Sequence, residues 1–170
     1  MKMNTISFQK YKNVLRKMGL DFSLLINDID SLERLDSFIY KMDSNYLLPS
    51  DNDVELKDYS KKLIENAYNF ILVEDDNDIS ILSIYVNDLI TKTAYCSSIG
   101  ILPTHQGRNI APILIDFGIQ FSKEMGMELI KAEVNKSNSK MITLFTGYDF
   151  HISSETEKNS YIITKELNVP

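Results

Sequence analysis

A polar loop with one glycine, set between an apolar run and an amphipathic segment, carries the residue types best suited to chemistry. The stretch ILPTHQGRNIAPILIDFG, residues 101–118, predicts a strand end, a loop and a helix start. A helix start leaves about four backbone N–H groups unpaired and carries partial positive charge, so it attracts phosphate. Gly107 has no Cβ, so a ligand can approach the backbone there, and Arg108 can add a positively charged contact. Asn109 can cap the helix through its side chain, and Pro112 suits the first helical turn, where its missing N–H costs no hydrogen bond.

The same residues also fit a capped helix that simply follows a polar turn, and the loop alone leaves both interpretations open. The phosphate-loop pattern GxxxxGK[ST] is absent. His105 and His151 are the only histidines and show no metal-ligand spacing, so no metal is expected. Cys96 is the only cysteine, which excludes an intrachain disulfide and suggests a small buried residue.

Composition favours one globular domain over residues 1–170, with residues 1–20 as a candidate extra N-terminal helix. The chain has 44% hydrophobic and 25% charged residues and a net charge of -6. This charge argues against nonspecific binding to nucleic acid. No apolar run reaches the roughly 18 residues that a membrane helix needs, and the N-terminus lacks a signal-peptide core. We therefore expect no membrane association and a cytoplasmic location.

The elements that must position the loop follow from apolar periodicity. Helical spacing is found over residues 7–18, from a cap at Asp30 or Ser31, from about Asp58 to Ala67, over 110–125 and over 137–147. Strand-like runs occupy residues 21–26, 68–74, 79–86, 93–102 and 127–134, and two more close the chain. Residues 75–78 predict a hairpin turn and residues 43–55 a polar loop. The order predicts an α/β (α+β) fold: a mixed, mostly antiparallel central sheet flanked by helices.

Three segments, in this order of elements, resemble the GNAT N-acetyltransferases. PTHQGRNIA, residues 103–111, resembles the acyl-CoA loop Q/R-x-x-G-x-G/A of that family, with Gln106, Asn109 and Ala111 at the three motif positions. AEVNKSN, residues 132–138, resembles the next strand and the asparagine after it. LFTGYDF, residues 144–150, resembles the segment L-Y-E-x-x-G-F. Order and spacing agree over about residues 68–167.

This resemblance implies a sheet splayed between its fourth and fifth strands, with acetyl-CoA as cosubstrate in the splay. Backbone groups near the end of the central strand would pair with the pantetheine arm and polarise the thioester carbonyl. The loop and helix start would bind the pyrophosphate, and Asn138 would contact the CoA arm. The implied cofactor-binding residues are Ile99, Gly100, Ile101, Gln106, Gly107, Arg108, Asn109, Ile110, Ala111, Pro112, Asn138 and Phe145.

The implied reaction is direct attack of an amine on the thioester, which requires a neutral amine and therefore a base. Glu133 matches a strand glutamate that has this role in some members, although a solvated strand carboxylate is the alternative. Phe145 stands where many members have a tyrosine that protonates the departing thiolate. Tyr148, the nearest phenol, is the candidate catalytic residue for that role, and a structural position is the alternative. Asn109 replaces the usual glycine, a position where asparagine tolerates positive φ. Asp149 replaces another glycine.

The acceptor expected from the resemblance is a small-molecule amine. A weakly catalytic acyl-CoA-binding module and a peptide or protein N-terminal acetyltransferase remain as alternatives. Acidic residues at 51, 53 and 55 could attract a cationic amine or simply form a solvated loop. Asp116 and Glu124, on the helix over 110–125, are expected to be surface residues. A homodimer through sheet edges or C-terminal strands is compatible with the family.

Overall fold

The structure, a computed structural model, describes residues 4–43 and 53–168. The helices of these residues are α1 (Ile6–Arg16), α2 (Ile29–Asp43), α3 (Asp53–Asn66), α4 (Ile110–Glu124) and α5 (Ser139–Gly147), with a short 3-10 turn at Pro103–His105. The strands are β1 (Asp21–Leu25), β2 (Tyr68–Glu74), β3 (Asn77–Asp88), β4 (Thr93–Ile101), β5 (Leu129–Asn135), β6 (His151–Glu155) and β7 (Ser160–Glu166). Every helix and strand expected from periodicity is present.

The strands form one mixed sheet in the order β1-β2-β3-β4-β5-β7-β6. Strands β2, β3 and β4 make the expected antiparallel meander, and the β4-α4-β5 unit supplies a parallel pair. The C-terminal hairpin inserts β7 beside β5 and leaves β6 at the edge. The mixed, mostly antiparallel sheet with flanking helices confirms the predicted fold class.

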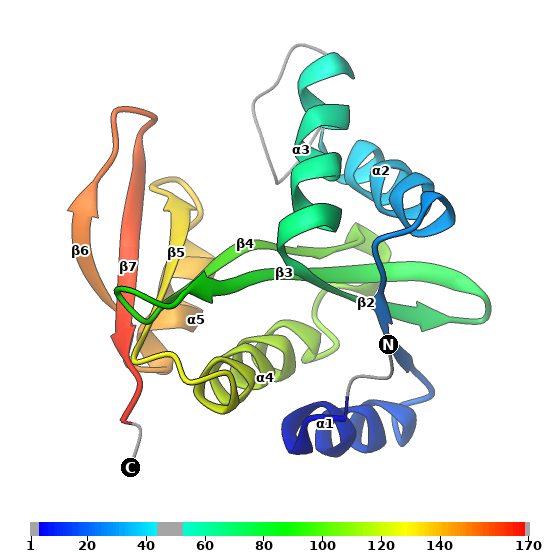
Figure 1. Cartoon of the computed structure of the whole chain (residues 1–170), viewed down its shortest axis with the longest axis horizontal. Coiled ribbons are helices and arrows are strands. Elements are labelled where there is room, and N and C mark those ends of the chain that lie inside the picture. Colours follow the sequence, from blue (N-terminus) through cyan, green and yellow to red (C-terminus); the bar gives the residue numbers. More distant parts are fainter. Residues whose placement is uncertain (1–3, 44–52, 169–170) are drawn as a thin grey trace.

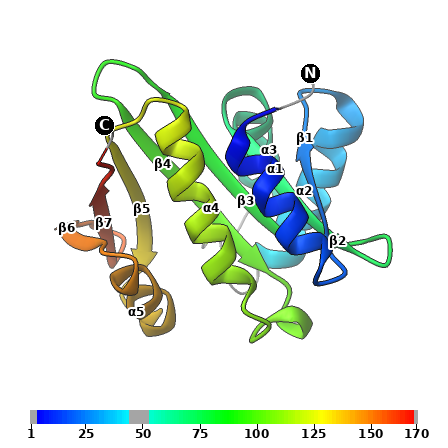
Figure 2. The ribbon, with the colours of Figure 1, turned by 90° about the horizontal axis from the view of Figure 1, so that it is seen from below.

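Helices cover both faces of the sheet, with α1 and α4 on one face and α2 and α3 on the other (Figures 1 and 2). Each face has its own apolar cluster. The larger cluster joins α1, α4 and α5 to the sheet and contains Phe22, Phe70 and Phe117. The smaller one joins α2 and α3 to the sheet through residues such as Leu35 and Leu63. None of the described helices is long and apolar enough to cross a membrane.

Several boundaries differ from the sequence expectation because side-chain hydrogen bonds and turn geometry decide them. The carboxylate of Asp28 accepts the Ser31 N–H at 2.7 Å, so α2 is capped by Asp28 rather than by Asp30 or Ser31. The tight turn between β2 and β3 is Asp75-Asp76, both at positive φ, and β3 begins directly after it. The polar loop expected over 43–55 ends earlier, since α3 starts at residue 53; Asp51 and the side chain at position 53 lie outside the described residues.

Asp116 and Glu124 are not simply surface residues, because they hold α1 against α4. The Glu124 carboxylate accepts the Ser7 N–H at 3.0 and 3.1 Å, at the first turn of α1. Asp116 accepts a hydrogen bond from the Tyr11 hydroxyl. The pKa of Tyr11 is raised, mainly because the phenol is buried and secondly because it donates a hydrogen bond to Asp116. These contacts dock the expected N-terminal helix on the helix that starts at the candidate loop.

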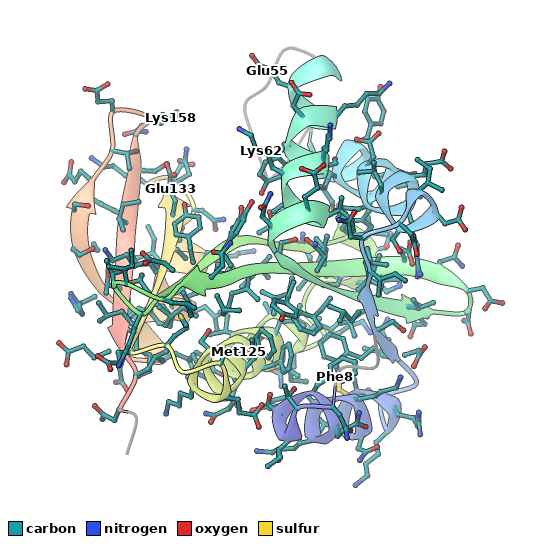
Figure 3. All side chains as sticks on the ribbon, in the orientation of Figure 1. Phe8, Glu55, Lys62, Met125, Glu133 and Lys158 are labelled. Carbon is teal, nitrogen blue, oxygen red and sulfur yellow. The ribbon has the colours of Figure 1, made fainter. Side chains whose placement is uncertain are left out.

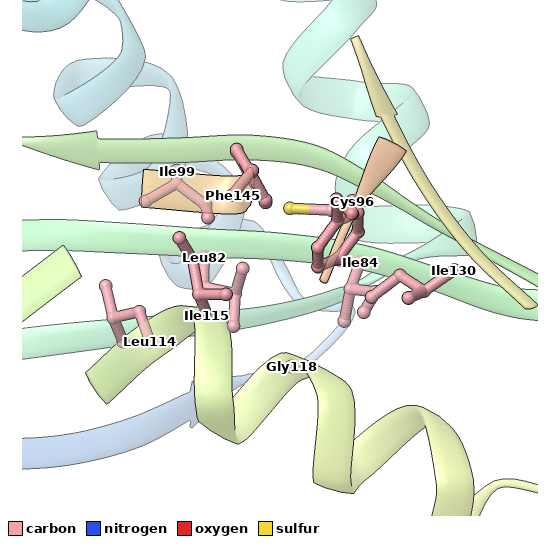
Figure 4. A pocket seen from close by; sticks show the side chains of 10 residues that line it. Leu82, Ile84, Cys96, Ile99, Leu114, Ile115, Gly118, Ile130 and Phe145 are labelled. Carbon is pink, nitrogen blue, oxygen red and sulfur yellow. The ribbon is translucent and has the colours of Figure 1, made fainter. Parts of the chain in front are cut away.

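A small apolar cavity between α4, α5 and the sheet marks a position where stability can be gained (Figure 4). Gly118 lies in the interior of α4 and lines this cavity. A Cβ there would meet Leu82 Cδ2 at 3.8 Å and Ile84 Cδ1 at 3.9 Å, which are ordinary contacts. Because alanine favours a helix interior over glycine by about 1 kcal/mol, we expect Gly118→Ala to raise the free energy of unfolding by about that amount. Urea denaturation measures it.

Gly126 provides the matched control for this substitution. It follows α4 at a φ of +79°, where a side chain is strained even though space is open. We expect Gly126→Ala to lower the free energy of unfolding by about 1 kcal/mol. A Gly118→Ala protein no more stable than the wild type would show that the cavity does not admit a methyl group.

Candidate active site

The site begins where β4 and β5 stop pairing. Their parallel register runs from Thr93–Leu129 to Cys96–Ala132 and ends there, while β4 continues to Ile101 and β5 to Asn135. The pairing of β4 with β3 steps from Ser83–Ser98 to Ile84–Cys96, so Ser97 is an extra residue in β4. Such a β-bulge bends the strand. The two diverging strands therefore present backbone N–H and C=O groups to the space between them, where an extended ligand can pair with them.

A pocket of about 540 Å³, including the solvent at its mouth, fills this divergence. Its lining comes from β4, β5 and α5: residues 96–99, residues 132–135, Asn138, Met141 and Phe145. Four sequence-predicted site residues therefore meet here: Ile99, Glu133, Asn138 and Phe145. Gly100 and Ile101 continue β4 toward the loop. A Cβ added at Gly100 would meet Met42 Cε of α2 and Ile81 Cγ2 of β3, both at 3.4 Å.

The loop from Gln106 to Asn109 lies beyond the end of β4 and leads into α4, whose first turn contains Ile110, Ala111 and Pro112. Gly107 has a φ of +78° and Asn109 a φ of +62°. Asn109 makes no side-chain cap hydrogen bond, which corrects the expectation that it caps α4. Its left-handed backbone instead turns the chain into the helix, as a glycine would. The first-turn N–H groups of α4, from Ile110 and Ala111 on, are thus not capped by Asn109 and suit an anion.

Side chains of the loop fix its position on the sheet. Gln106 Nε2 donates to the Ile101 carbonyl at 3.1 Å. Glu74, at the end of β2, accepts from Arg108 at 2.6 and 2.8 Å and lies 3.0 Å from His105 Nε2. The hydrogen bond from Arg108, with help from His105, lowers the pKa of Glu74 to about 2. Arg108, expected to contact a phosphate, is thus paired with a carboxylate in this structure.

The depressed pKa of Glu74 gives a pH-dependent contribution to stability. A lowered folded-state pKa means that the contribution is complete above the ordinary carboxyl pKa of 4.5 and is lost as pH falls toward about 2. We expect Glu74→Gln to be less stable than the wild type near pH 7, and the difference to shrink as pH falls to about 3. Urea denaturation at the two pH values measures it. Glu65→Gln, at an exposed position of α3, is the control. A stability difference between Glu74→Gln and the wild type that does not change with pH would contradict the pairing of Glu74 with Arg108 and His105.

Glu133 and Tyr148 lie in different surroundings. Glu133 is exposed on β5 between the buried Ala132 and Val134 (Figure 3). Ala132 and Val134 belong to the apolar cluster on the α4 face, so strand alternation turns Glu133 toward the other face. The pKa of Tyr95 is raised to about 12, mainly by the burial of Tyr95 and secondly by the negative charge of Glu133. The Tyr148 hydroxyl donates to the Pro112 carbonyl at 3.0 Å, so this phenol braces the first turn of α4. Tyr148 is not among the residues that line the pocket.

Two other predicted residues have structural contacts as well. The Asn138 side-chain oxygen caps α5 by accepting the Met141 N–H at 3.2 Å, which leaves its amide NH₂ group for a ligand. The Phe145 ring is buried and packs edge-on against Phe150, with 4.9 Å between ring centroids. Cys96 is buried as expected, and burial raises its pKa to about 12, so a thiolate nucleophile is disfavoured.

Sequence reasoning did not single out Tyr59 or Ser97. The Tyr59 hydroxyl, from α3, lies 2.6 Å from Ser98 Oγ and 2.9 Å from Ser97 Oγ. Leu56 and Leu63 place the same face of α3 toward the core, so helical spacing could have shown that Tyr59 faces the sheet. No sequence signal locates the bulge that brings both serines under it. Within residues 4–43 and 53–168, no three His, Cys, Asp or Glu converge to hold a metal ion.

Comparison with known proteins gives the same fold. A model of the acetyltransferase (GNAT) family matches residues 30–150. No curated protein matches the sequence significantly. The ribosomal-protein-S18-alanine N-acetyltransferase of Escherichia coli has a TM-score of 0.69 at 16% identity, over 89% of this chain and 96% of that one. The spermidine N-acetyltransferase of Vibrio cholerae, solved with CoA and spermine, has a TM-score of 0.65 at 19% identity, over 89% and 98%.

Proposed function

The chain belongs to the acetyltransferase (GNAT) family, and from that premise we propose that it transfers the acetyl group of acetyl-CoA to a primary amine on a small molecule. Enzymes of this family use acetyl-CoA, and one structural neighbour is solved with CoA. The observation that carries the proposal is the divergence of β4 from β5, with a pocket between the strands and, beyond one end, a helix start that has no side-chain cap.

In this proposal CoA lies along the diverging edge of β4. Its pyrophosphate is held by the backbone N–H groups from Gly107 to Ala111, in the loop and the first turn of α4. Its pantetheine arm pairs with the backbone from Ile99 to Ile101, and the Asn138 amide contacts it from the other wall. The thioester then lies near the bulge at Ser97, beside Phe145.

The acceptor amine approaches from the face of the sheet opposite α4, where Glu133 is exposed. A negative charge there suits a cationic amine, and the carboxylate can remove the proton that the ammonium must lose before attack. The neutral amine then adds to the thioester carbonyl, and CoA leaves as the thiol. Glu133 is the base in this scheme. Tyr148, braced on Pro112, supports the cofactor loop rather than the departing sulfur.

Thiol release from acetyl-CoA tests the proposal directly. Purified protein is supplied with acetyl-CoA and, in separate reactions, spermidine, glucosamine, a free amino acid and a peptide with an N-terminal alanine. We expect turnover with at least one of the three small amines and CoA binding by calorimetry. Turnover confined to the peptide would favour the N-terminal acetyltransferase alternative. Tight CoA binding with no turnover would favour a binding module, and no CoA binding would exclude both.

A further inference from the structure

The hydroxyl groups around the bulge of β4 form a connected chain that opens into the pocket at both ends. Tyr59 stands in the middle, 2.9 Å from Ser97 Oγ and 2.6 Å from Ser98 Oγ. Both serines line the pocket, whereas Tyr59 reaches them from α3. Ser98 is buried and Ser97 is half-buried. A phenol both donates and accepts one hydrogen bond readily, so Tyr59 can link the two serines.

This arrangement matters because the transfer releases two protons from nitrogen and must place one on sulfur. An ammonium loses its first proton before attack, the role given to Glu133 above. After attack, the nitrogen of the tetrahedral intermediate loses a second proton, while the departing thiolate must gain one. Phe145, which packs at the pocket floor, has no proton to give.

Among the residues that line the pocket, only Ser97 and Ser98 carry a hydroxyl group. Cys96 also lines the pocket, but it is buried, and burial raises the pKa of its thiol to about 12, which makes it a weak acid. The side-chain amides of Asn135 and Asn138 are poor acids. Burial likewise raises the pKa of Tyr59, despite the opposing effect of its two serine hydrogen bonds, so the phenol stays protonated at neutral pH. The chain of three hydroxyls is thus intact under ordinary conditions.

We propose that Ser97, Tyr59 and Ser98 form a proton relay that carries the second proton from the attacking nitrogen to the CoA sulfur. Ser97 Oγ accepts the proton from nitrogen and passes its own to the Tyr59 oxygen; Tyr59 passes its own to Ser98 Oγ, and Ser98 protonates the sulfur as the C–S bond breaks. Each hydroxyl ends as it began, and the products are the amide and the free thiol. Ser97 and Ser98 are then catalytic residues, and Tyr59 connects and positions them.

The direction of proton transfer follows from the surroundings of the two serines at the ends of the relay. Ser98 is the deeper serine and directly precedes Ile99, where the proposed pantetheine path begins, so it lies toward the sulfur. Ser97 is more open, and Glu133 lines the same pocket, so Ser97 lies toward the incoming amine. This assignment rests on the proposed function, since it presumes acetyl transfer in this pocket.

The test uses Tyr59→Phe and Ser98→Ala in the full chain, with acetyl-CoA and whichever panel amine gives the highest wild-type turnover. We expect each variant to lower kcat about 100-fold while leaving the KM for acetyl-CoA within about twofold, because only a transition-state interaction is removed. The double variant should lose no more than either single variant, since the hydroxyls act as one unit. Tyr85→Phe is the matched control: it removes a phenol near Tyr59 and outside the relay, and kcat should not change.

A rescue experiment separates the relay from a merely structural role of Tyr59. Phe145→Tyr places a phenol at the pocket floor, where it can protonate sulfur directly. We expect this substitution to raise kcat much more in the Tyr59→Phe background than in the wild type, because only the former lacks a proton donor. An unchanged kcat in Tyr59→Phe, or an equal gain from Phe145→Tyr in both backgrounds, would overturn the relay and leave the proposed function standing. A wild type that binds CoA but transfers no acetyl group would overturn both.

Discussion

Glu133→Gln is expected to lower kcat/KM for the amine by roughly 10²- to 10⁴-fold, the usual loss when a general base is removed. Glutamine preserves the size and polarity of the side chain but cannot accept the ammonium proton. CoA affinity should be unchanged, because in the proposed arrangement Glu133, an exposed residue of the pocket lining, faces the acceptor amine and not CoA. Steady-state thiol release and CoA calorimetry measure the two quantities.

The pH dependence of this variant gives a second check. Aliphatic amines titrate near a pKa of about 10, so raising the pH supplies neutral amine without a base. The deficit of Glu133→Gln relative to the wild type should therefore shrink as pH rises. Glu166→Gln, an exposed carboxylate on β7, is the control and should match the wild type. Turnover in Glu133→Gln equal to the wild type would remove Glu133 as the base and return it to a solvated strand residue.

Phe117→Ala is expected to have the largest effect on stability, a loss of about 3 to 5 kcal/mol. The Phe117 side chain is fully buried in α4. Its ring meets Phe70 at 4.7 Å and Phe22 at 5.0 Å between centroids, both edge-on, and stacks on Phe121 at 5.7 Å. Alanine removes the ring and leaves a cavity where α1, α4 and the sheet meet, so both transfer energy and packing are lost. Urea denaturation measures the difference.

Two control variants test whether the stability loss in Phe117→Ala comes from the buried volume that is removed. Phe117→Leu retains most of the buried volume and should cost less than Phe117→Ala. Tyr40→Ala removes an aromatic ring that is 64% exposed on α2, and its effect should stay within about 0.5 kcal/mol. A loss below about 1 kcal/mol in Phe117→Ala would show that this aromatic cluster can collapse around the missing ring.

Much of the fold was predictable from local signals. Apolar spacing over 110–125 placed α4, because a helix of that length must turn one stripe to the core. The short links between the runs at 68–74, 79–86 and 93–102 predicted the meander, because short connections join antiparallel neighbours. Helix starts were less predictable: Asp28 caps α2 and Asn109 does not cap α4, since capping depends on dihedral angles that residue type alone does not fix.

The candidate site likewise contains some residues that the sequence could assign and others that it could not. Residues close together in sequence, such as Gly107 and Asn109, could be assigned to one loop because the chain itself holds them together. The pairing of Arg108 with Glu74 and the approach of Tyr59 to Ser97 and Ser98 join residues more than thirty positions apart, and no periodicity reports such distances.

The sequence by itself determined the order and type of the elements, the loop before α4 and the family resemblance, because these depend on spacing along the chain. The tertiary structure alone decided where the sheet opens, since a single extra residue at Ser97 bends β4 away from β5. It also decided which hydroxyl groups meet there. Bulges and contacts between distant elements arise from packing the whole sheet between its helices, and packing is a property of the folded chain rather than of any segment.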